Sequence, residues 1–371
     1  MIQKKKVIVG MSGGVDSSVA AYLLKEQGYD VIGVTMQIWQ DEDTLTQEEN
    51  SGCCGLSAVD DARRVAADIG IPYYVMNFKK EFKQYVMDDF ANEYYLGHTP
   101  NPCIRCNRYV KWEALLNRAM ALGADYIATG HYAQVVRLSS GRYALKAAPS
   151  SKDQTYALYN LTQEQLARTL MPVGSYTKEE IRAIAQKIGL KVATKPDSQD
   201  ICFVPDGKYH EFLESYTGKK IPCGNFVDRQ GHVLGVHKGI THYTVGQRKG
   251  LDLAMGHPVF VTEIRPETNE VVIGENSDVF GRGLVAHSLN FMAMERPAGP
   301  VRVWAKVRYA HKGAWCTLTV TGDDTAEFIF DEPVRAITPG QAVVFYEGDV
   351  VAGGGVIEKA IHCDTKGEAL S

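Results

Sequence analysis

The chain has 371 residues, of which 45% are hydrophobic and 23% are charged, and its formal net charge is −4. This length exceeds what one hydrophobic core usually supports, so we expect two or three domains, and the composition excludes a disordered, collagen-like or coiled-coil protein. The slight negative charge excludes a protein that coats DNA through an overall positive surface, so any contact with nucleic acid must come from local patches.

From the sequence we expect neither a membrane segment nor a secretion signal. No apolar run approaches the roughly 18 residues that a spanning helix needs. The stretch MIQKKKVIVGMSGG has basic residues before an apolar run, but that run is short and leads into a glycine-rich turn rather than a cleavage site. We therefore expect a cytoplasmic protein without membrane contact, whose eight cysteines are reduced, catalytic or metal-binding rather than structural disulfides.

Up to residue 207, apolar runs that are typical of buried strands alternate with segments of helical periodicity. The expected strands are residues 5–11, 29–39, 71–78 and 124–133. The expected helices are residues 16–28, 57–69, 111–122 and 178–188, and Ser57 with Asp60 resembles a capping box. This alternation predicts an α/β domain with a parallel sheet and helices on both of its faces.

The pattern changes after about residue 205. Residues 229–251 are glycine-rich, contain no acidic residue, and carry four Lys or Arg and three His. From about residue 275, short alternating strands separated by turn residues predict a small closed β-barrel. We place the domain boundaries at 1–207 for the α/β domain, 208–274 for a small central domain and 275–371 for the barrel domain.

The stretch VIVGMSGGVDSS, residues 7–18, has the pattern of an anion-binding loop between a strand and a helix. Gly13 and Gly14 let the backbone approach an anion, and the opening helix directs free N–H groups and the positive end of its dipole at it. Ser12, Ser17 and Ser18 add hydroxyl donors. The Walker pattern G-K-[ST] and the dinucleotide pattern G-x-G-x-x-G are both absent. The alternative is a tight turn without a ligand.

This motif resembles the pyrophosphatase-type (PP) loop of adenine-nucleotide alpha-hydrolase-like enzymes, which split ATP into AMP and pyrophosphate. The resemblance implies that a carbonyl oxygen is adenylated and then replaced by a nucleophile. It implies that ATP, with Mg²⁺, is bound by Gly10, Met11, Ser12, Gly13, Gly14, Val15, Asp16 and Ser17. The adenine would lie over the carboxyl ends of the strands. Met36 and Gly130, at two such ends, are placed to touch it, although each also fits a core or turn position.

Three cysteines lie in two further motifs, Cys103 and Cys106 in TPNPCIRCN and Cys202 in TKPDSQDICFVPDG. Together with GHYAQV, SKDQTYALYNL, THYTVGQRKGL and WAKVRYA, these motifs resemble the bacterial tRNA-specific 2-thiouridylases over essentially the whole chain. That family replaces the carbon-2 oxygen of the wobble uridine with sulfur in tRNAs for Glu, Gln and Lys. The resemblance implies an ATP-dependent tRNA-uridine 2-sulfurtransferase in which the PP-loop domain precedes the central domain and the barrel.

The resemblance also implies separate roles for the cysteines. Cys202 would receive a persulfide from a sulfur-relay protein, and Cys106 would be the nucleophile of thiolation and close a transient disulfide with Cys202. Because thiols have a pKa of roughly 8.5, both need an activating environment. Arg105, Arg108 and His131 could provide it, or could be ordinary surface or phosphate-contact residues.

Cys103 departs from the family pattern, which often has Asp at this position as a proposed acid/base group. A thiol is a different proton carrier from a carboxylate, so that role is either dispensable or belongs to another group. By position, Asn101, Pro102 and Cys103 should still border the target uridine, which must leave its stack to be reached.

A metal site is a further interpretation of the cysteines. Cys103, Cys106 and Cys202, with one more ligand, could hold zinc or an iron–sulfur cluster, although a second C-x-x-C pair is absent. The adjacent Cys53 and Cys54 fit a loop or a helix entry. The remaining cysteines carry no motif and are expected to serve packing: Cys223, Cys316 and Cys363.

The C-terminal part has a candidate RNA-binding segment in residues 296–322, which contain five Lys or Arg and no acidic residue. Alternation predicts that Val303 and Ala305 face the barrel core while Arg302, Trp304 and Lys306 face outward, which suits RNA or a solvated strand face. The resemblance implies tRNA contacts at His131, Lys152, Asp153, Gln154, Arg308, Tyr309 and Gln341. Strand spacing puts Arg308 and Tyr309 on opposite faces, so joint contact requires a strand end or a bulge there.

Two other functions compete with tRNA thiolation. A PP-loop ATP-pyrophosphatase that makes amides, such as a synthetase fed with ammonia, would not need Cys106 and Cys202 together or a basic barrel. A non-catalytic, redox-sensitive RNA-binding protein would not need the phosphate loop. For the thiolase, we expect residues 40–56 and 195–210 to become ordered only when tRNA binds.

Overall fold

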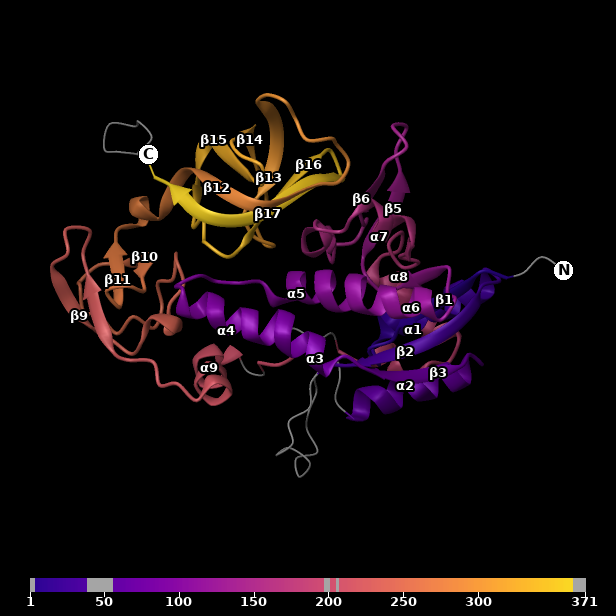
Figure 1. Ribbon diagram of the computed structural model, residues 1–371. Coiled ribbons are helices and arrows are strands. Elements are labelled where there is room, and N and C mark those ends of the chain that lie inside the picture. Colours follow the sequence, from indigo (N-terminus) through magenta and orange to yellow (C-terminus); the bar gives the residue numbers. More distant parts are fainter. Residues whose placement is uncertain (1–3, 39–55, 197–200, 205–206, 363–371) are drawn as a thin grey trace. The chain divides into compact units, whose positions relative to one another are not determined.

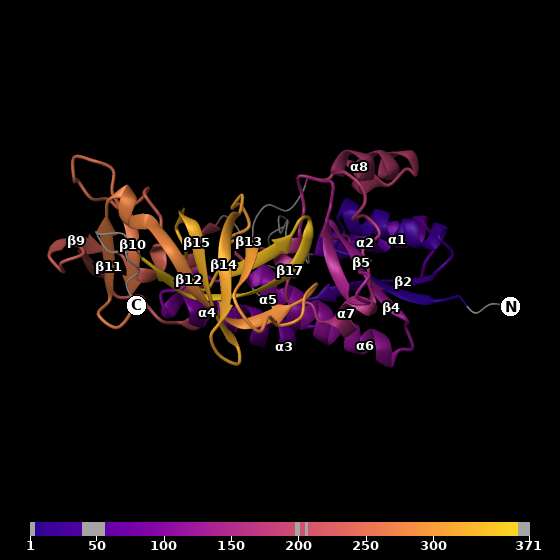
Figure 2. The same ribbon diagram turned by 90° about the horizontal axis from the view of Figure 1, so that it is seen from above.

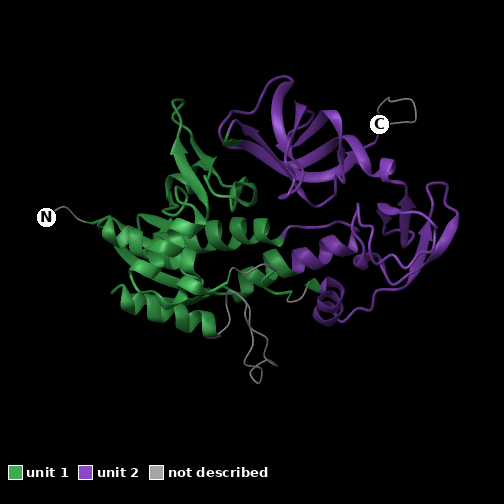
Figure 3. Ribbon diagram, turned by 180° about the vertical axis from the view of Figure 1, so that it is seen from behind, with its two compact units in different colours: residues 1–87, 102–207, 349–351 green, residues 88–101, 208–348, 352–371 purple. Residues whose placement is uncertain are grey.

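The computed structural model describes residues 4–38, 56–196, 201–204 and 207–362 (Figure 1). The chain divides into two compact units (Figure 3). Unit 1 comprises residues 1–87, 102–207 and 349–351, and unit 2 comprises residues 88–101, 208–348 and 352–371. Both units therefore combine segments that are far apart in the sequence.

Unit 1 is built on a five-stranded parallel sheet with the strand order β3-β2-β1-β4-β7. Its strands are β1 (Lys6–Gly10), β2 (Asp30–Gln37), β3 (Tyr73–Asn77), β4 (Tyr126–Ala128) and β7 (Thr169–Leu170). The order reverses between β1 and β4, which is the point where open α/β sheets bind ligands beyond the carboxyl ends of their strands. The predicted parallel α/β sheet is confirmed.

Helices cover both faces of this sheet (Figure 2). Those of unit 1 are α1 (Val15–Glu26), α2 (Leu56–Asp68), α3 (Lys79–Phe82), η2 (Lys83–Met87), α5 (Pro102–Arg105), η3 (Cys106–Leu115), α6 (Leu116–Ala121), η4 (Thr155–Leu158), α7 (Gln163–Ala167), α8 (Lys178–Lys187) and η5 (Lys191–Thr194). The main core joins α1, α2 and α8 to the sheet through buried residues such as Val19, Val65 and Ile181. Such buried aliphatic faces are the main stabilising contribution to a fold of this kind.

Several predicted boundaries in unit 1 are wrong. Helix α2 begins at Leu56, so Ser57 lies inside it and is not an N-cap. The fourth strand ends at Ala128, because the chain then turns and enters an antiparallel hairpin of β5 (Ala133–Arg137) and β6 (Tyr143–Ala147). Capping boxes are present instead at α7, formed by Thr162 and Gln165, and at α8, where the side chains of Thr177 and Glu180 each accept a hydrogen bond from the other's backbone N–H.

Unit 2 contains two β structures. A four-stranded sheet has the order β10-β11-β8-β9. Its strands are β8 (Gly224–Val227), β9 (Val233–His237), β10 (Phe260–Arg265) and β11 (Glu270–Gly274). The described helical elements of unit 2 are α4 (Asp88–Tyr95), α9 (Tyr209–Thr217), η7 (Ile240–His242) and η8 (Asn276–Val279).

The second structure is a closed barrel with the strand order β12-β15-β14-β13-β16-β17, in which β12 also pairs with β17 (Figure 1). Its strands are β12 (Phe280–Phe291), β13 (Val301–Lys306), β14 (Ala314–Val320), β15 (Thr325–Arg335), β16 (Ala342–Glu347) and β17 (Val350–Ile361). The first two residues of β17, Val350 and Val351, belong to unit 1. Val303, Ala305, Phe328 and Phe345 fill the barrel core. The predicted closed barrel is confirmed.

None of the described helices combines the length and the apolar character that crossing a bilayer requires. The loop of residues 40–56, which we expected to respond to tRNA, lies outside the described residues except for Leu56.

Candidate functional site

The glycine-rich loop connects the end of β1 at Gly10 to the start of α1. Gly13 has a φ of +70°, and a Cβ there would lie 2.3 Å from the carbonyl oxygen of Ala58, so both backbone conformation and space require glycine. Gly14 is the N-cap of α1 and offers no side-chain acceptor to the first turn. The N–H groups at this helix start are therefore available to an anion, in the direction that the helix dipole favours.

The three serines of the motif differ in their hydrogen bonds. Ser17 and Ser18 donate from Oγ to the carbonyl oxygen of Gly14 at 3.2 and 2.8 Å, and Ser18 is fully buried. Ser12 is exposed, and its backbone N–H donates to Ser17 Oγ at 3.2 Å. Ser18 therefore braces the loop, whereas Ser12 displays its hydroxyl on the surface of the loop.

Asp16, in the first turn of α1, is held by two groups that are distant in the sequence. The Tyr132 hydroxyl donates to its carboxylate at 2.7 Å, and Lys178 Nζ lies 2.8 Å from both carboxylate oxygens. The Lys178 side chain is only 9% exposed. Gln154 in turn holds the backbone of Tyr132 through two hydrogen bonds of 2.9 Å. Lys178 and Tyr132 were not predicted from the sequence, because no local pattern connects them to the loop.

A second lysine reaches the loop from the segment after η5. Lys195 Nζ lies 2.7 Å from Oδ2 of Asp61 on α2 and 3.3 Å from the carbonyl oxygen of Gly13. Lys195 lies in the motif TKPDSQDICFVPDG, but no spacing rule connects that motif to a loop more than 180 residues earlier.

The two residues expected to touch the adenine lie at the carboxyl edge of the sheet. Met36 is half-buried near the end of β2, and Gly130 follows the end of β4. A Cβ at Gly130 would come within 2.6 Å of the Ser17 backbone nitrogen, so glycine lets this turn pack directly against the start of α1. The structure thus brings the loop and Gly130 together, and the adenine contact itself stays a prediction.

His131 belongs to a polar cluster beside this turn. Its Nδ1 lies 2.7 Å from Thr129 Oγ1, and its Nε2 lies 3.4 Å from Lys111 Nζ, which donates to Asn107 at 2.8 Å. Burial, with the nearby Lys111 charge, holds the pKa of His131 well below its usual value. The lowered pKa favours the neutral form of His131, and its suggested role in activating a thiol stays a prediction.

Cys103 and Cys106 lie at the start of a helical run from Pro102 to Ala121, which begins earlier than the predicted helix. Pro102 suits the first helical position, because its missing N–H would have no partner there. Cys103 is exposed and Cys106 is half-buried. Their spacing of three places them on the same side of the helix. The run is π-helical from Cys106 to Leu115, a local widening that is frequent at functional sites.

The two arginines near Cys106 contact an aromatic pair. The guanidinium groups of Arg105 and Arg108 lie 4.6 and 5.1 Å from the ring centre of Tyr109, which stacks on Tyr85 at 4.8 Å. Arg108 also lies 3.8 Å from Glu113. Two positive groups thus lie within two residues of Cys106, as the sequence indicated.

Cys202 is half-buried within the short described segment of residues 201–204. Its neighbour Phe203 is 1% exposed and packs edge-on against Phe82 at 5.5 Å between ring centres. This aromatic contact fixes the chain directly beside Cys202 to the body of unit 1.

The cysteines do not support the metal interpretation. Within the described part of the chain, no three His, Cys, Asp or Glu side chains are grouped so that they could hold a metal ion. Cys103, Cys106 and Cys202 are all described, so these three do not fit a zinc site or an iron–sulfur cluster. Cys53, Cys54 and Cys363 lie outside the described residues.

The two remaining cysteines differ from each other. Cys316 is fully buried in the barrel core, and burial raises the pKa of its thiol to about 12, so the packing role is confirmed. Cys223 is exposed, so its predicted packing role is wrong.

Of the predicted tRNA-contact residues at 152–154, only Lys152 has an exposed side chain. The carboxylate of Asp153 accepts hydrogen bonds from the backbone of Ala148 and Thr155 and from the Thr155 hydroxyl. Gln154 contacts Tyr132, so these bonds connect the turn to the group of Asp16, Tyr132 and Lys178, which we call the Asp16 anchor.

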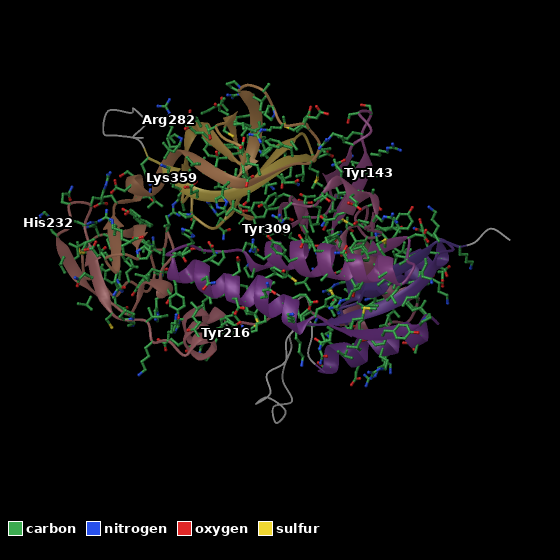
Figure 4. The ribbon with its side chains drawn as sticks, in the orientation of Figure 1. Tyr143, Tyr216, His232, Arg282, Tyr309 and Lys359 are labelled. Atoms are coloured by element: carbon green, nitrogen blue, oxygen red, sulfur yellow. The ribbon has the colours of Figure 1, made fainter. Side chains whose placement is uncertain are left out.

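In unit 2, Arg308 and Tyr309 lie beyond the end of β13 at Lys306, so the strand end that joint contact requires is present. Tyr309, labelled in Figure 4, is 50% exposed. Arg308 donates to the carbonyl oxygen of Arg335 at 2.7 Å, and Gln341 donates to that of Thr99 at 2.7 Å.

Arg308 and Gln341 border a hollow of about 220 Å³ within unit 2. It is lined by Thr99, Thr244, Val245, Gly246, Arg308, Arg335, Ala336, Thr338 and Gln341. The lining includes two arginines and no acidic residue. The Thr99 hydroxyl oxygen is buried and makes no hydrogen bond to the described residues. Such a lining suits an anionic or hydrogen-bonding ligand.

The outward face of β13 is less basic than its sequence indicated. Arg302 on β13 forms a bidentate ion pair with Asp331 on β15, the strand beyond β14, and also lies 5.5 Å from the ring centre of Trp315 on β14. The hydrogen bond from Arg302 lowers the pKa of Asp331. A strand that is not adjacent to β13 in the sheet therefore supplies the acidic partner that residues 296–322 lack.

The fold and the site define a class of protein. A parallel α/β domain carries a PP-type loop at its topological switch point, and a small β domain and a closed barrel follow. Family models match the three segments in turn. The tRNA methyl transferase HUP domain matches residues 5–206, the tRNA methyl transferase PRC-barrel domain residues 210–275, and the aminomethyltransferase β-barrel domain residues 281–357.

Similarity to individual proteins is higher still. The chain is 68% identical over 356 residues to the tRNA-specific 2-thiouridylase MnmA of Lachnoclostridium phytofermentans, covering 96% of this chain and all of that one. It is 54% identical to the MnmA of Clostridioides difficile over 97% of this chain, and 56% identical to that of Acetivibrio thermocellus over 96%, again covering 100% of each relative. The chain therefore belongs to the tRNA-specific 2-thiouridylase family.

Proposed function

We propose that this protein is a tRNA-uridine 2-sulfurtransferase that uses ATP to replace the carbon-2 oxygen of a tRNA uridine with sulfur. The observation that carries the proposal is the 68% identity with a tRNA-specific 2-thiouridylase over 96% of the chain. The phosphate loop supports it, because a protein that only binds RNA has no use for an anion site at a sheet switch point. An amide-forming synthetase is not favoured by the relatives.

The first step would be adenylation of the uracil. The carbon-2 oxygen attacks the α-phosphorus of ATP, the bond to the bridging oxygen breaks, and pyrophosphate leaves with the electron pair. Residues 10–17 would hold the phosphates through backbone N–H groups, with Mg²⁺ as their counter-ion, and Met36 and Gly130 would contact the adenine. The Asp16 anchor would keep the helix start fixed while charge develops.

The second step would be sulfur transfer. A protein persulfide donor would load Cys202, and the terminal sulfur then attacks carbon 2 while AMP leaves. The thiolate of Cys106 next attacks Sγ of Cys202, which frees the 2-thiouridine and leaves a Cys106–Cys202 disulfide for a thiol reductant to reopen. Arg105 and Arg108 flank Cys106 in the sequence and helix α5 begins four residues before it, and we expect these positive groups to assist the attack by Cys106.

The tRNA would be held by contacts from both units. We propose that Asn101, Pro102 and Cys103 border the flipped uridine, and that the tRNA is held by His131, Lys152, Asp153, Gln154, Arg308, Tyr309 and Gln341. The hollow lined by Arg308 and Gln341 supports this assignment for unit 2. Because His131 is neutral, its contribution would be a hydrogen bond rather than a charge.

The proposal also covers the tRNA substrates, the sulfur donor, the location and the domain boundaries. The substrates would be tRNAs for Glu, Gln and Lys, modified at the wobble uridine in the cytoplasm, with a sulfur-relay protein as donor. The domains would divide at residues 1–207, 208–274 and 275–371. Because Cys103, Cys106 and Cys202 are not grouped as metal ligands among the described residues, the proposal assigns no step to an iron–sulfur cluster.

One assay tests the function. The protein is incubated under reducing, anaerobic conditions with ATP, Mg²⁺, a persulfide donor and undermodified tRNA, and the nucleosides are analysed by mass spectrometry. We expect 2-thiouridine and AMP in equal amounts. No 2-thiouridine would contradict the proposal, and full activity of Cys106→Ser would contradict the nucleophile assignment.

A further inference from the structure

Lys195 brings an ammonium group to the phosphate loop, and the reaction as described gives it no role. Its Nζ lies 3.3 Å from the carbonyl oxygen of Gly13, the residue whose left-handed conformation shapes the loop. Lys195 is 37% exposed and its partner Asp61 is 27% exposed, so their 2.7 Å contact is open to solvent. A full positive charge therefore lies at the rim of the anion site.

The other lysine at the loop is held differently. Lys178 contacts both oxygens of Asp16 and is only 9% exposed, so moving it would break two charge-assisted hydrogen bonds of a shielded lysine and leave Asp16 with Tyr132 as its remaining partner among the described residues. Asp61, in contrast, has a second cationic neighbour, Arg64, at 3.9 Å. Asp61 would keep a positive partner if Lys195 moved away. Of the two lysines, Lys195 is the one that can change partners at low cost.

We infer that Lys195 binds the pyrophosphate part of ATP, with its ammonium group moving from Asp61 to the phosphate oxygens when nucleotide occupies the loop. The identity of the nucleotide rests on the proposed function. Backbone N–H groups offer only partial charges, whereas an ammonium group supplies a full one. As the bond from the α-phosphorus to the bridging oxygen breaks, the electron pair passes to pyrophosphate, and Lys195 stabilises this growing negative charge.

The position of Lys195 in the sequence connects the nucleotide site to Cys202. Lys195 precedes Cys202 by seven residues in one motif. The segment that carries the proposed sulfur acceptor would then also carry a nucleotide contact.

The test is calorimetric binding of pyrophosphate and of α,β-methylene ATP, each with Mg²⁺, to the full chain without tRNA. We expect Lys195→Ala to weaken binding of both probes about ten- to hundredfold and Lys195→Arg to stay within about threefold of the wild type. The control is Lys191→Ala, which removes an exposed lysine four residues earlier and should change nothing. If Lys195→Ala binds both probes within about twofold of the wild type, the inference is overturned.

A second variant keeps the test decisive if Lys195→Ala does not fold. Asp61→Asn removes the competing carboxylate, so pyrophosphate should bind about two- to fivefold more tightly. A purely structural Lys195–Asp61 bridge predicts unchanged or weaker binding, and that result would overturn the inference. If the wild type binds neither probe, the proposed function is contradicted as well. If the wild type binds both probes and neither substitution changes the affinity, only the role of Lys195 is contradicted.

Discussion

Asp16 depends on partners that lie 116 and 162 residues further along the chain, Tyr132 and Lys178. An aspartate in the first turn of a helix already interacts favourably with the helix dipole. Here its carboxylate is also fixed by an ammonium and a phenol group. The start of α1 therefore keeps its position without a ligand, which reduces what binding an anion costs in ordering the loop.

The first prediction concerns this ion pair. Lys178→Met should lower the free energy of unfolding by about 2–3 kcal/mol, because it leaves a partly buried carboxylate with only Tyr132 as a partner. It should also weaken binding of α,β-methylene ATP about tenfold. Urea titration and calorimetry measure the two effects. Lys187→Met, at the exposed end of α8, is the control, and equal losses in both variants would contradict the anchor role.

Cys103 is exposed near the start of its helix, one turn before Cys106. General acid–base catalysis typically contributes a factor of 10²–10⁴ in rate. We expect Cys103→Ala to keep the single-turnover rate of thiolation within about threefold of the wild type, because a thiol replaces the frequent carboxylate poorly. A loss of more than about tenfold that Cys103→Asp restores would show that this position does carry a proton.

At the scale of elements, the site is the junction of β1, α1 and the turn after β4. The glycines at this junction have different reasons for being glycine. Gly13 needs its left-handed backbone and the space beside Ala58, whereas Gly130 needs only space beside Ser17. At Gly14 a Cβ would find its nearest neighbour at 3.5 Å, an ordinary contact.

These differences predict a graded response to alanine. Gly13→Ala and Gly130→Ala should each lower the free energy of unfolding by about 2–4 kcal/mol and reduce nucleotide binding at least about tenfold, because backbone atoms must shift. Gly14→Ala should cost at most about 1 kcal/mol. Thermal melts and calorimetry compare the three variants, and equal behaviour at Gly13 and Gly14 would contradict the packing argument.

The turn after β13 contains a group that titrates in the acid range. Burial, followed by the charges of Arg308 and Lys306, lowers the pKa of His311 to about 4, and its Nδ1 accepts a hydrogen bond from Val307 N–H. Since the unfolded chain has the higher pKa, about 6.5, it takes up a proton first as the pH falls. The contribution of neutral His311 to stability is therefore complete above about pH 6.5 and is lost progressively toward pH 4.

The corresponding experiment is urea unfolding at pH 7.0, 5.5 and 4.5. After discounting for partial exposure, the wild type should lose about 1 kcal/mol more between pH 7.0 and 4.5 than His311→Gln, whose amide does not titrate. Parallel curves for wild type and His311→Gln would contradict the shift.

At the scale of the whole molecule, each unit assembles its site from distant segments. The hollow of unit 2 takes Thr99 from one segment, Thr244–Gly246 from a second, and its arginines from the barrel. Arg335 lies 5.3 Å from the ring centre of Phe260 and donates to the carbonyl oxygen of Gly246 at 3.4 Å. Its guanidinium group is thus oriented by Gly246 of the second segment and by Phe260 at the start of β10.

We expect Arg335→Ala to weaken tRNA binding about three- to tenfold and to reduce the slope of log K against log salt by about 0.9, the value for one lost phosphate contact. Filter binding at several salt concentrations measures both quantities. Arg265→Ala is the control, because Glu263 already pairs with that guanidinium group. An unchanged salt slope would show that Arg335 makes no phosphate contact.

The sequence alone was sufficient for the parallel sheet, the glycine-rich loop and the closed barrel. These features depend on local patterns: apolar runs that bury in strands, Gly13 and Gly14 between a strand and a helix, and alternation in residues 301–308. Local backbone preferences and side-chain periodicity are properties of neighbouring residues, so they can be recognised before the chain is folded.

Only the tertiary structure decided the partners of charged groups. It paired Lys178 with Asp16, Lys195 with Asp61 and Arg302 with Asp331, and it left His131 neutral beside Lys111. It also separated the three cysteines into thiols that do not form a metal site among the described residues. The physical reason is that ion pairs and pKa shifts depend on distance and burial, which arise when segments far apart in the sequence pack together.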